Sequence, residues 1–215
     1  MAGERGMGAL GFAFVSPEAA QAWVNAYYTA YTQRLNKLCD YQTNPAIAVV
    51  AGFMCADTDE AAERMADGWT FFQFSLMFYS KHGVIAPGTI SLWDEYQKWR
   101  QTEAGQKNAG GLIGSPETIR EKLQMFQDAN VDQVILLNQA GKNTHEDICS
   151  SLELFAQEVM PEFHASESEH QEWKQQVLAG DIVLEEIDTT PFNSPARAKP
   201  TKAPGTAPPI ASGAL

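Results

Sequence analysis

The stretch from Ile113 to Phe163 reads as helix, strand and helix, and it constrains the fold more than any other part of the chain. Ser115 is expected to cap the first helix, because Pro116 follows it at a position where no backbone N–H is needed. The apolar run Val131–Leu137 resembles a short strand buried on both faces of a parallel sheet. Thr144 is expected to open the second helix with a capping box. Such a unit belongs to an α/β fold with helices outside a parallel sheet.

Two further apolar runs precede this unit, Ala9–Val15 and Ala46–Cys55, and a polar helix start follows each of them. Together with Val131–Leu137 they predict about three parallel strands with surrounding helices. Gly6–Gly11 matches the G-x-G-x-x-G fingerprint of dinucleotide-binding proteins. That motif needs a strand before it and a helix after it, whereas these residues lead into a strand. We therefore interpret the glycines as the approach to a buried strand.

Composition excludes several classes of partner. The chain has 215 residues, enough for one domain with a sizeable core. Its net charge of -12 argues against a nucleic-acid backbone or an anionic membrane as a partner. The three cysteines show no CxxC spacing, which indicates a reducing cytoplasm and neither a disulfide framework nor a zinc site. No apolar run is long enough to cross a bilayer, and the histidines lack metal-site spacing, so no metal is expected.

Trp69–Tyr79 is the most aromatic window of the chain, and its role stays open between two interpretations. It could be ordinary core or a subunit interface, or it could line a substrate pocket. The connection from Asp57 to Asn130 is too long for a simple crossover helix, so an excursion is expected there. Cys55 comes at the end of its strand. We interpret it as a buried structural thiol, because no activating group can be placed beside it.

These residues also carry a family resemblance. Gly111–Phe163 resembles the C-terminal end of the bacterial luciferase-like monooxygenases, which are flavin-dependent (β/α)8-barrel enzymes. The matching signs are the helix start Ser115–Glu117, the strand entry Asn130–Asp132, the Gln-Ala-Gly turn and the closing Val159–Phe163. Gly6–Ser16 is similar to a more N-terminal barrel strand of the same family.

The resemblance implies a partial (β/α)8 barrel, since a whole barrel needs eight strands and typically about 250 residues. We expect residues 1–164 to form the C-terminal part of the barrel domain, residues 165–188 a short helical or extended extension, and residues 189–215 a disordered Pro/Ala-rich tail. Three strands with open edges would leave half of a core exposed. We therefore expect either a truncated chain of such an enzyme or a chain that completes its barrel with a second polypeptide.

The resemblance further implies a flavin-dependent monooxygenase that oxidises a small organic substrate with O2 and reduced FMN. The cofactor carries that chemistry, and the protein positions it and excludes water. Asn138 and Gln139, at the end of the third strand, are the candidate cofactor contacts, although turn formation alone would also explain them. Phe12, Phe14 and Phe53 are the candidate pocket wall. No catalytic residue is assigned.

Two alternative functions follow from the missing strands. One is a non-catalytic remnant that serves as an interaction or oligomerisation partner of a full-length relative. The other is a deazaflavin-dependent oxidoreductase of the same superfamily. A homo-oligomer or a complementing barrel chain is the expected partner. The substrate, the electron donor and the oligomeric state stay open.

Overall fold

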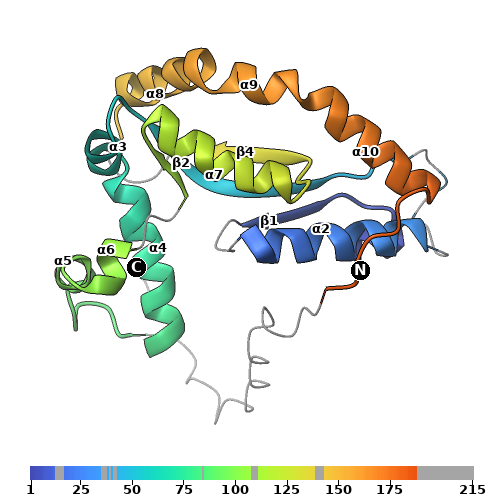
Figure 1. Ribbon diagram of the computed structural model, residues 1–215. Coiled ribbons are helices and arrows are strands. Elements are labelled where there is room, and N and C mark those ends of the chain that lie inside the picture. Colours follow the sequence, from blue (N-terminus) through green and yellow to red (C-terminus); the bar gives the residue numbers. More distant parts are fainter. Residues whose placement is uncertain are drawn as a thin grey trace, which may run out of the picture.

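The computed structural model describes residues 1–12, 17–34, 38, 40, 43–83, 85–107, 111–138 and 143–187. Within them, one parallel sheet contains β1 (Ala9–Phe12), β2 (Ile47–Cys55), β3 (Leu112–Gly114) and β4 (Gln133–Leu137). β2 is the centre of this sheet (Figure 1). It pairs with β1 along one edge and with β4 along the other, and its last residues pair with β3. The predicted α/β class with parallel strands is confirmed.

β3 is a strand that the sequence did not predict. It has three residues, and contacts from elsewhere in the chain hold it in place. Lys122 Nζ donates to the carbonyl oxygens of Gly111 and Ile113 at 3.2 and 2.9 Å. Asp59 Oδ1 accepts a hydrogen bond of 2.7 Å from the Ser115 amide. Because β3 pairs with β2 and is held by Asp59, both far away in sequence, no local pattern predicts this strand.

The helices are α1 (Ala2–Arg5), α2 (Pro17–Thr32), α3 (Asp59–Met65), α4 (Asp67–His82), α5 (Leu92–Arg100), α6 (Glu103–Lys107), α7 (Pro116–Asp128), α8 (His145–Glu158), α9 (Met160–Ala165) and α10 (Glu167–Ala179). The predicted caps are confirmed: Ser115 caps α7, and Thr144 forms a capping box with Asp147 at α8. Asn130 adopts the left-handed conformation after α7, with φ of 56°. Within the described residues, no helix combines the length and apolarity of a membrane span.

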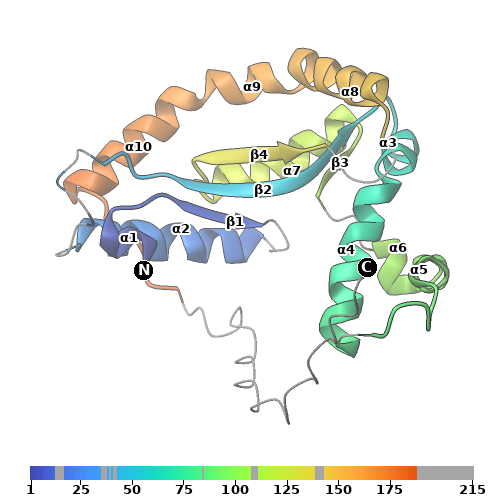
Figure 2. The same cartoon turned by 180° about the vertical axis from the view of Figure 1, so that it is seen from behind.

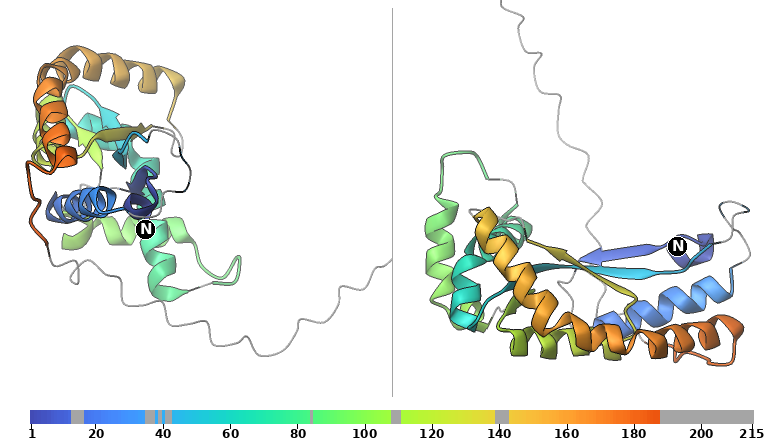
Figure 3. Two further views of the ribbon diagram at one scale, coloured as in Figure 1. Left: turned by 90° about the vertical axis from the view of Figure 1, so that its right-hand side faces the viewer. Right: turned by 90° about the horizontal axis from the view of Figure 1, so that it is seen from above.

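One face of the sheet, the outer face, is covered by helices. Because paired residues of neighbouring strands share a face, Gly11, Val49 and Val134 all point to this side. Figure 3 (right) shows α2, α7 and α10 on the same side of the strands. The cluster that fills this layer is the main core, and it comprises Val49, Ala51, Phe53, Cys55, Ile119, Leu123, Phe126, Phe155 and Val159.

The opposite face, the inner face, is largely open. Helices α3 and α4 pack on it near Met54, at the carboxyl end of β2. Elsewhere its apolar side chains on β1 and β4 reach solvent, with Leu10 63%, Phe12 49% and Ile135 38% exposed, whereas those of β2 are buried. Seen from behind, the strands face the viewer without a helix drawn across them (Figure 2). An open arc of parallel strands with helices on its outer face is the partial barrel that the sequence predicted.

The end of the described chain returns to the sheet. α10 lies in the segment predicted as an extension, and its Trp173 and Val177 pack on the buried face of α2. Beyond α10, the carbonyl of Glu185 accepts a hydrogen bond of 2.9 Å from Asn25 Nδ2 on α2. The division between residues 1–164 and 165–188 stays a prediction, and the tail predicted for residues 189–215 lies outside the described residues.

Asp132, just before β4, ties several elements together at the amino end of the sheet. Its carboxylate accepts hydrogen bonds from the Tyr28 hydroxyl at 2.8 Å and the Ile47 amide at 2.7 Å. His170 Nε2 and Lys174 Nζ of α10 each lie 3.0 Å from Oδ1. Burial by itself raises the pKa of Asp132, but the hydrogen bonds from His170, Ile47, Tyr28 and Lys174 outweigh it and lower the pKa. This carboxylate therefore clamps α2, β2 and α10 together.

Replacing the clamp should destabilise the fold strongly. Asp132→Asn keeps the shape but leaves Lys174 of α10 without its counter-charge, so we expect the free energy of unfolding to fall by about 3 kcal/mol at neutral pH. Urea unfolding measures this loss. The exposed Asp128→Asn on α7 is the matched control, and it should change stability by less than about 0.5 kcal/mol.

The same variant should alter the dependence of stability on pH. Because folding lowers the pKa of Asp132, its contribution is present above the ordinary aspartate pKa of about 4 and is lost as pH falls through the folded value. Wild-type protein should therefore lose more stability than Asp132→Asn on acidification below about pH 4. Parallel stability curves for the two proteins would contradict the clamp.

Candidate functional site

The carboxyl ends of the parallel strands lie at one side of the sheet, and α3, α4, α5 and α6 gather beyond them (Figure 1). Here the indole of Trp69 on α4 lies directly on Gly52 of β2. A Cβ added to Gly52 would come within 1.9 Å of Trp69 Cε2, so only glycine permits this approach. Gly52 also pairs with Leu137 of β4, which places the buried indole beside the strand end that Asn138 follows.

Several buried polar atoms at this end have no hydrogen-bond partner in the described part of the chain. They are Trp69 Nε1, Gln73 Oε1, Asn138 Nδ2 and Asn143 Oδ1. Trp69 and Gln73 are one turn apart on α4, while Asn138 and Asn143 border the connection from β4 to α8. A buried polar group left without a partner costs about 1–3 kcal/mol. Two donors and two acceptors of this kind mark the carboxyl end as a candidate binding site.

A cavity of about 840 Å³ lies at the same end, and its size falls within the range of small-molecule sites. Phe71 of α4 and Trp93 of α5 supply apolar surface, with their ring centroids 5.2 Å apart. Asn143, just before α8, also lines this cavity. The complete lining is Arg64, Met65, Asp67, Gly68, Phe71, Trp93, Asn143 and Asp147.

The structure separates the residues that the sequence singled out. Asn138 follows β4 and carries one of the unpartnered amide nitrogens. Phe12 ends β1 on the inner face, whereas Phe53 lies on the outer face, 2% exposed, with its ring centroid 5.0 Å from that of Phe155. Since they lie on opposite faces, Phe12 and Phe53 do not line one pocket, and Phe53 is a core residue. Gln139 and Phe14 lie outside the described residues.

The aromatic window divides between the two roles that the sequence left open. Phe71 and Phe74 pack against α5, where their partners are Trp93, Tyr96 and Trp99. Phe78 packs on Phe74 and His82 within α4. This side of α4 is core. Trp69 and Gln73, on its other side, carry two of the unpartnered atoms. They belong to the aromatic window, but the sequence did not name either as a site residue. The signal that could have found Trp69 is Gly52, because a glycine inside a strand often marks a close approach.

The described cysteines are Cys55 and Cys149, and Cys55 does not provide a nucleophile. Cys55 is buried, and its amide donates a hydrogen bond of 2.7 Å to Ser151 Oγ. Burial, followed by the charge of Asp57, raises the pKa of the Cys55 thiol to about 11, so it is protonated at neutral pH. Cys149 Sγ lies 3.5 Å from His145 Nε2 on the exposed start of α8. No group of three or more His, Cys, Asp or Glu residues in the described ranges is placed to hold a metal ion.

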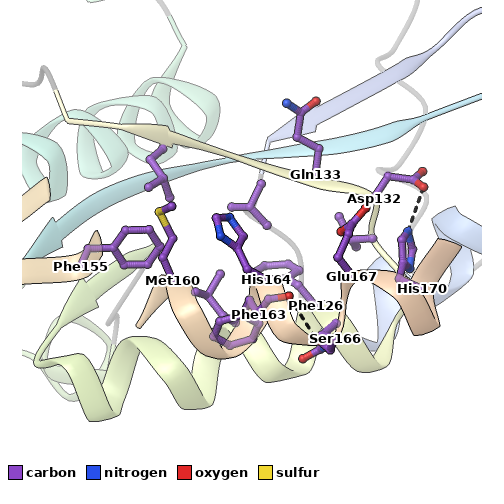
Figure 4. A pocket seen from close by; sticks show the side chains of 15 residues that line it. Phe126, Asp132, Gln133, Phe155, Met160, Phe163, His164, Ser166, Glu167 and His170 are labelled. Atoms are coloured by element: carbon purple, nitrogen blue, oxygen red, sulfur yellow. Dashed lines mark hydrogen bonds and ion pairs between the residues drawn. The ribbon is translucent and has the colours of Figure 1, made fainter. Parts of the chain in front are cut away.

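A second cavity, of about 370 Å³, lies on the outer side between β4, α7 and the α9–α10 corner (Figure 4). Phe126, Phe155 and Phe163 form much of its apolar wall. Asp132 is a buried charged residue of this lining, and its hydrogen bond with His170, another lining residue, is drawn in Figure 4. Because Asp132 is already satisfied by its partners and lies at the amino end of the sheet, we assign this cavity to helix packing.

A comparison with known protein families identifies the family of this chain. The sequence profile of the luciferase-like monooxygenase family matches residues 1–133, which is more than half of the 215-residue chain. The chain belongs to the luciferase-like monooxygenase family. No curated protein matches it.

Three solved structures illustrate the similarity. The oxygenating constituent of 3,6-diketocamphane monooxygenase from Pseudomonas putida, a type II Baeyer–Villiger monooxygenase in complex with FMN, is 23% identical over 74% of this chain and 44% of that chain, with a TM-score of 0.49. Monooxygenase RslO1 from Streptomyces bottropensis is 17% identical over 75% and 44%, with a TM-score of 0.48. Coenzyme F420 dependent tetrahydromethanopterin reductase from Methanopyrus kandleri is 18% identical over 75% and 47%, with a TM-score of 0.49. The chain thus spans less than half the length of each structure.

The close approach of Trp69 to Gly52 can be tested directly. Gly52→Ala should force the indole off the strand, lower the free energy of unfolding by about 1–3 kcal/mol and shift tryptophan emission to longer wavelength. Urea unfolding and emission spectra check both effects. Gly8→Ala is the control, since its Cβ would meet the Ala46 carbonyl oxygen at an ordinary 3.4 Å. Equal behaviour of the two variants would contradict the stacking.

Proposed function

We propose that this chain takes part in flavin-dependent monooxygenation, in which reduced FMN and O2 oxidise a small organic substrate. Membership of the luciferase-like monooxygenase family, matched over residues 1–133, carries the proposal. The cavity and the unpartnered polar atoms at the carboxyl ends of the strands support it, because barrel enzymes hold their ligands at that end. The chain would bind the cofactor and substrate there, in the cytoplasm that its cysteine usage predicts.

The donors and acceptors of the site fit one edge of a flavin ring. That edge carries carbonyl oxygens and a ring N–H, so it needs both donors and acceptors from the protein. Asn138 Nδ2 and Trp69 Nε1 would donate to the carbonyl oxygens, and Asn143 Oδ1 or Gln73 Oε1 would accept from the N–H. When bound, the flavin supplies the redox chemistry with O2. Satisfying these buried atoms would also remove their desolvation cost.

The remaining candidate residues have supporting roles in this proposal. Gln139 would add a second amide beside Asn138. Phe12 and Phe14, at the end of β1 and just after it, would form an apolar wall that keeps water from the reacting centre. Because the chain spans less than half of the solved structures, we propose that it supplies one wall of the flavin site.

A flavin titration tests this assignment. Quenching of FMN fluorescence by the chain should give saturable binding, and Trp69→Phe and Asn138→Ala should each weaken it about tenfold, the loss expected for one buried hydrogen bond. Gln124→Ala, on the exposed side of α7, should leave the affinity unchanged. No binding by the folded chain, or equal affinity of all three variants, would contradict the proposed site.

The choice of cofactor separates the monooxygenase from a deazaflavin-dependent oxidoreductase. A 5-deazaflavin titrated in parallel should bind more weakly than FMN if the proposal is correct. Substrate-dependent O2 uptake with reduced FMN would add a chemical readout. Preference for the deazaflavin, without O2 uptake, would favour the oxidoreductase.

A role as an interaction partner of a full-length relative is the second candidate function. The observation that favours it is the open inner face, where Leu10 and Ile135 are exposed on β1 and β4, the two strands that flank β2. Such a surface is more typical of an interface than of a monomer in water. The absence of flavin binding together with stoichiometric co-elution with a full-length family member would select this role.

A further inference from the structure

The cavity between β4, α7 and the α9–α10 corner, here called the outer cavity, arises from helix packing and is not filled by it. Val134 and Leu136 line it from the outer face of β4. Phe126 of α7 and Phe155 of α8 line it from the main core, where they are 9% and 7% exposed. Its volume of about 370 Å³ lies at the lower end of the range for small-molecule sites. The outer cavity therefore has room for a small ligand.

Most of the wall of the outer cavity is apolar. More than half of its lining residues are apolar, and they come from α7, β4, α8, α9 and the turn before β4. Since all of these elements belong to this chain, no further strand is needed to form the cavity. Side chains around an empty apolar space lose contacts, and such a space takes up apolar molecules in preference to water. The wall therefore favours a ligand with an apolar body.

A row of polar side chains borders the outer cavity along α9 and α10. His164, Glu167 and His170 follow one another at intervals of three residues, and Figure 4 shows His164 and Glu167 rising from the helices toward β4. His170 Nε2 lies 3.0 Å from Asp132 Oδ1, and Glu167 Oε1 accepts a hydrogen bond of 2.7 Å from Gln171 Nε2. The imidazole of His164 has no hydrogen-bond partner among the described residues. It is therefore available to a ligand.

The charges at the outer cavity argue against a charged ligand. The buried carboxylate of Asp132 already has Lys174 Nζ at 3.0 Å, so it needs no further cation. Glu167 is exposed, and an ion pair with a carboxylate in water contributes little. A charged ligand would lose its hydration against the apolar wall without a buried counter-charge in return.

We propose that the outer cavity binds a small uncharged molecule with an apolar body and one hydroxyl group. The apolar body lies against Val134, Phe126 and Phe155, and the hydroxyl reaches His164. An uncharged imidazole has one donor and one acceptor nitrogen, and a hydroxyl group can serve either of them. The inference is independent of the proposed flavin chemistry, because Val134 faces the outer side of the sheet whereas Trp69 packs on the inner side.

Three probes of one shape test the chemistry of the ligand. Calorimetric titration of the chain with para-propylphenol should give saturable binding to one site. Propylbenzene, which lacks the hydroxyl, should bind about fivefold more weakly, the loss expected for one hydrogen bond. The carboxylate of para-propylbenzoate should make it the weakest of the three.

Two variants test the position of the site. Val134→Phe places a ring in the cavity, so it should weaken the binding of para-propylphenol and of propylbenzene about tenfold each. Val183→Phe is the matched control, because Val183 is 91% exposed, and it should leave both affinities unchanged. His164→Leu should weaken the binding of para-propylphenol alone. His164 is exposed, so this variant keeps the fold and the test if Val134→Phe does not fold.

Four outcomes would overturn the inference. They are the absence of saturable para-propylphenol binding to the folded chain, equal affinity for para-propylphenol and propylbenzene, tighter binding of para-propylbenzoate, and unchanged binding in a folded Val134→Phe variant. The first would make the outer cavity a packing void only. No flavin is present in these titrations, so the inference and the proposed function fail separately.

Discussion

The structure depends on one strand that is hydrogen-bonded along both edges and buried along its whole length. All nine residues of β2 are buried, as expected for a strand inside a parallel sheet. The outer-face side chains of β2 build the main core with α7 and α8. On the inner face, Met54 of β2 packs with Trp69 near the start of α4. β1, β3 and β4 all pair with β2, and α3 and α8 contact it. The inner face of the sheet is largely open because few strands flank β2.

The two ends of the sheet differ in how their polar groups are satisfied. At the amino end, Asp132 collects hydrogen bonds from three elements, and Arg34 Nε, beside Gly6, is the one buried atom there without a partner among the described residues. At the carboxyl end, Trp69, Gln73, Asn138 and Asn143 each bury a polar atom without a partner among the described residues. A satisfied network stabilises a fold, whereas buried groups without partners can be satisfied by a ligand. This asymmetry matches the division of barrels into a stability face and a functional face.

Local chemistry made much of the fold predictable. Ser115 and Thr144 cap their helices as expected, Asn130 makes the left-handed turn, and the long apolar runs became β2 and β4. Features that depend on distant contacts were not predictable. β3 needs Lys122 and Asp59 to hold it, and it is too short to show a period of its own.

The candidate site was predictable in part. The position of Asn138 at a strand end follows from the sequence, because the end of an apolar run is visible there. The face that Phe53 occupies does not, since an apolar run without alternation hides which residues point to which side. For the same reason Leu10 was not recognised as an inner-face residue beside Phe12. The stacking of Trp69 on Gly52 joins residues 17 positions apart across two elements, and neither residue alone predicts it.

The central role of β2 can be measured by amide hydrogen exchange along the chain. The account predicts that the amides of Ile47–Cys55 exchange most slowly, close to the rate set by global unfolding, while those of α5 and α6 exchange through local opening. Exchange of the β2 amides as fast as those of α5 and α6 would contradict it, because a strand that opens so readily cannot hold the sheet together.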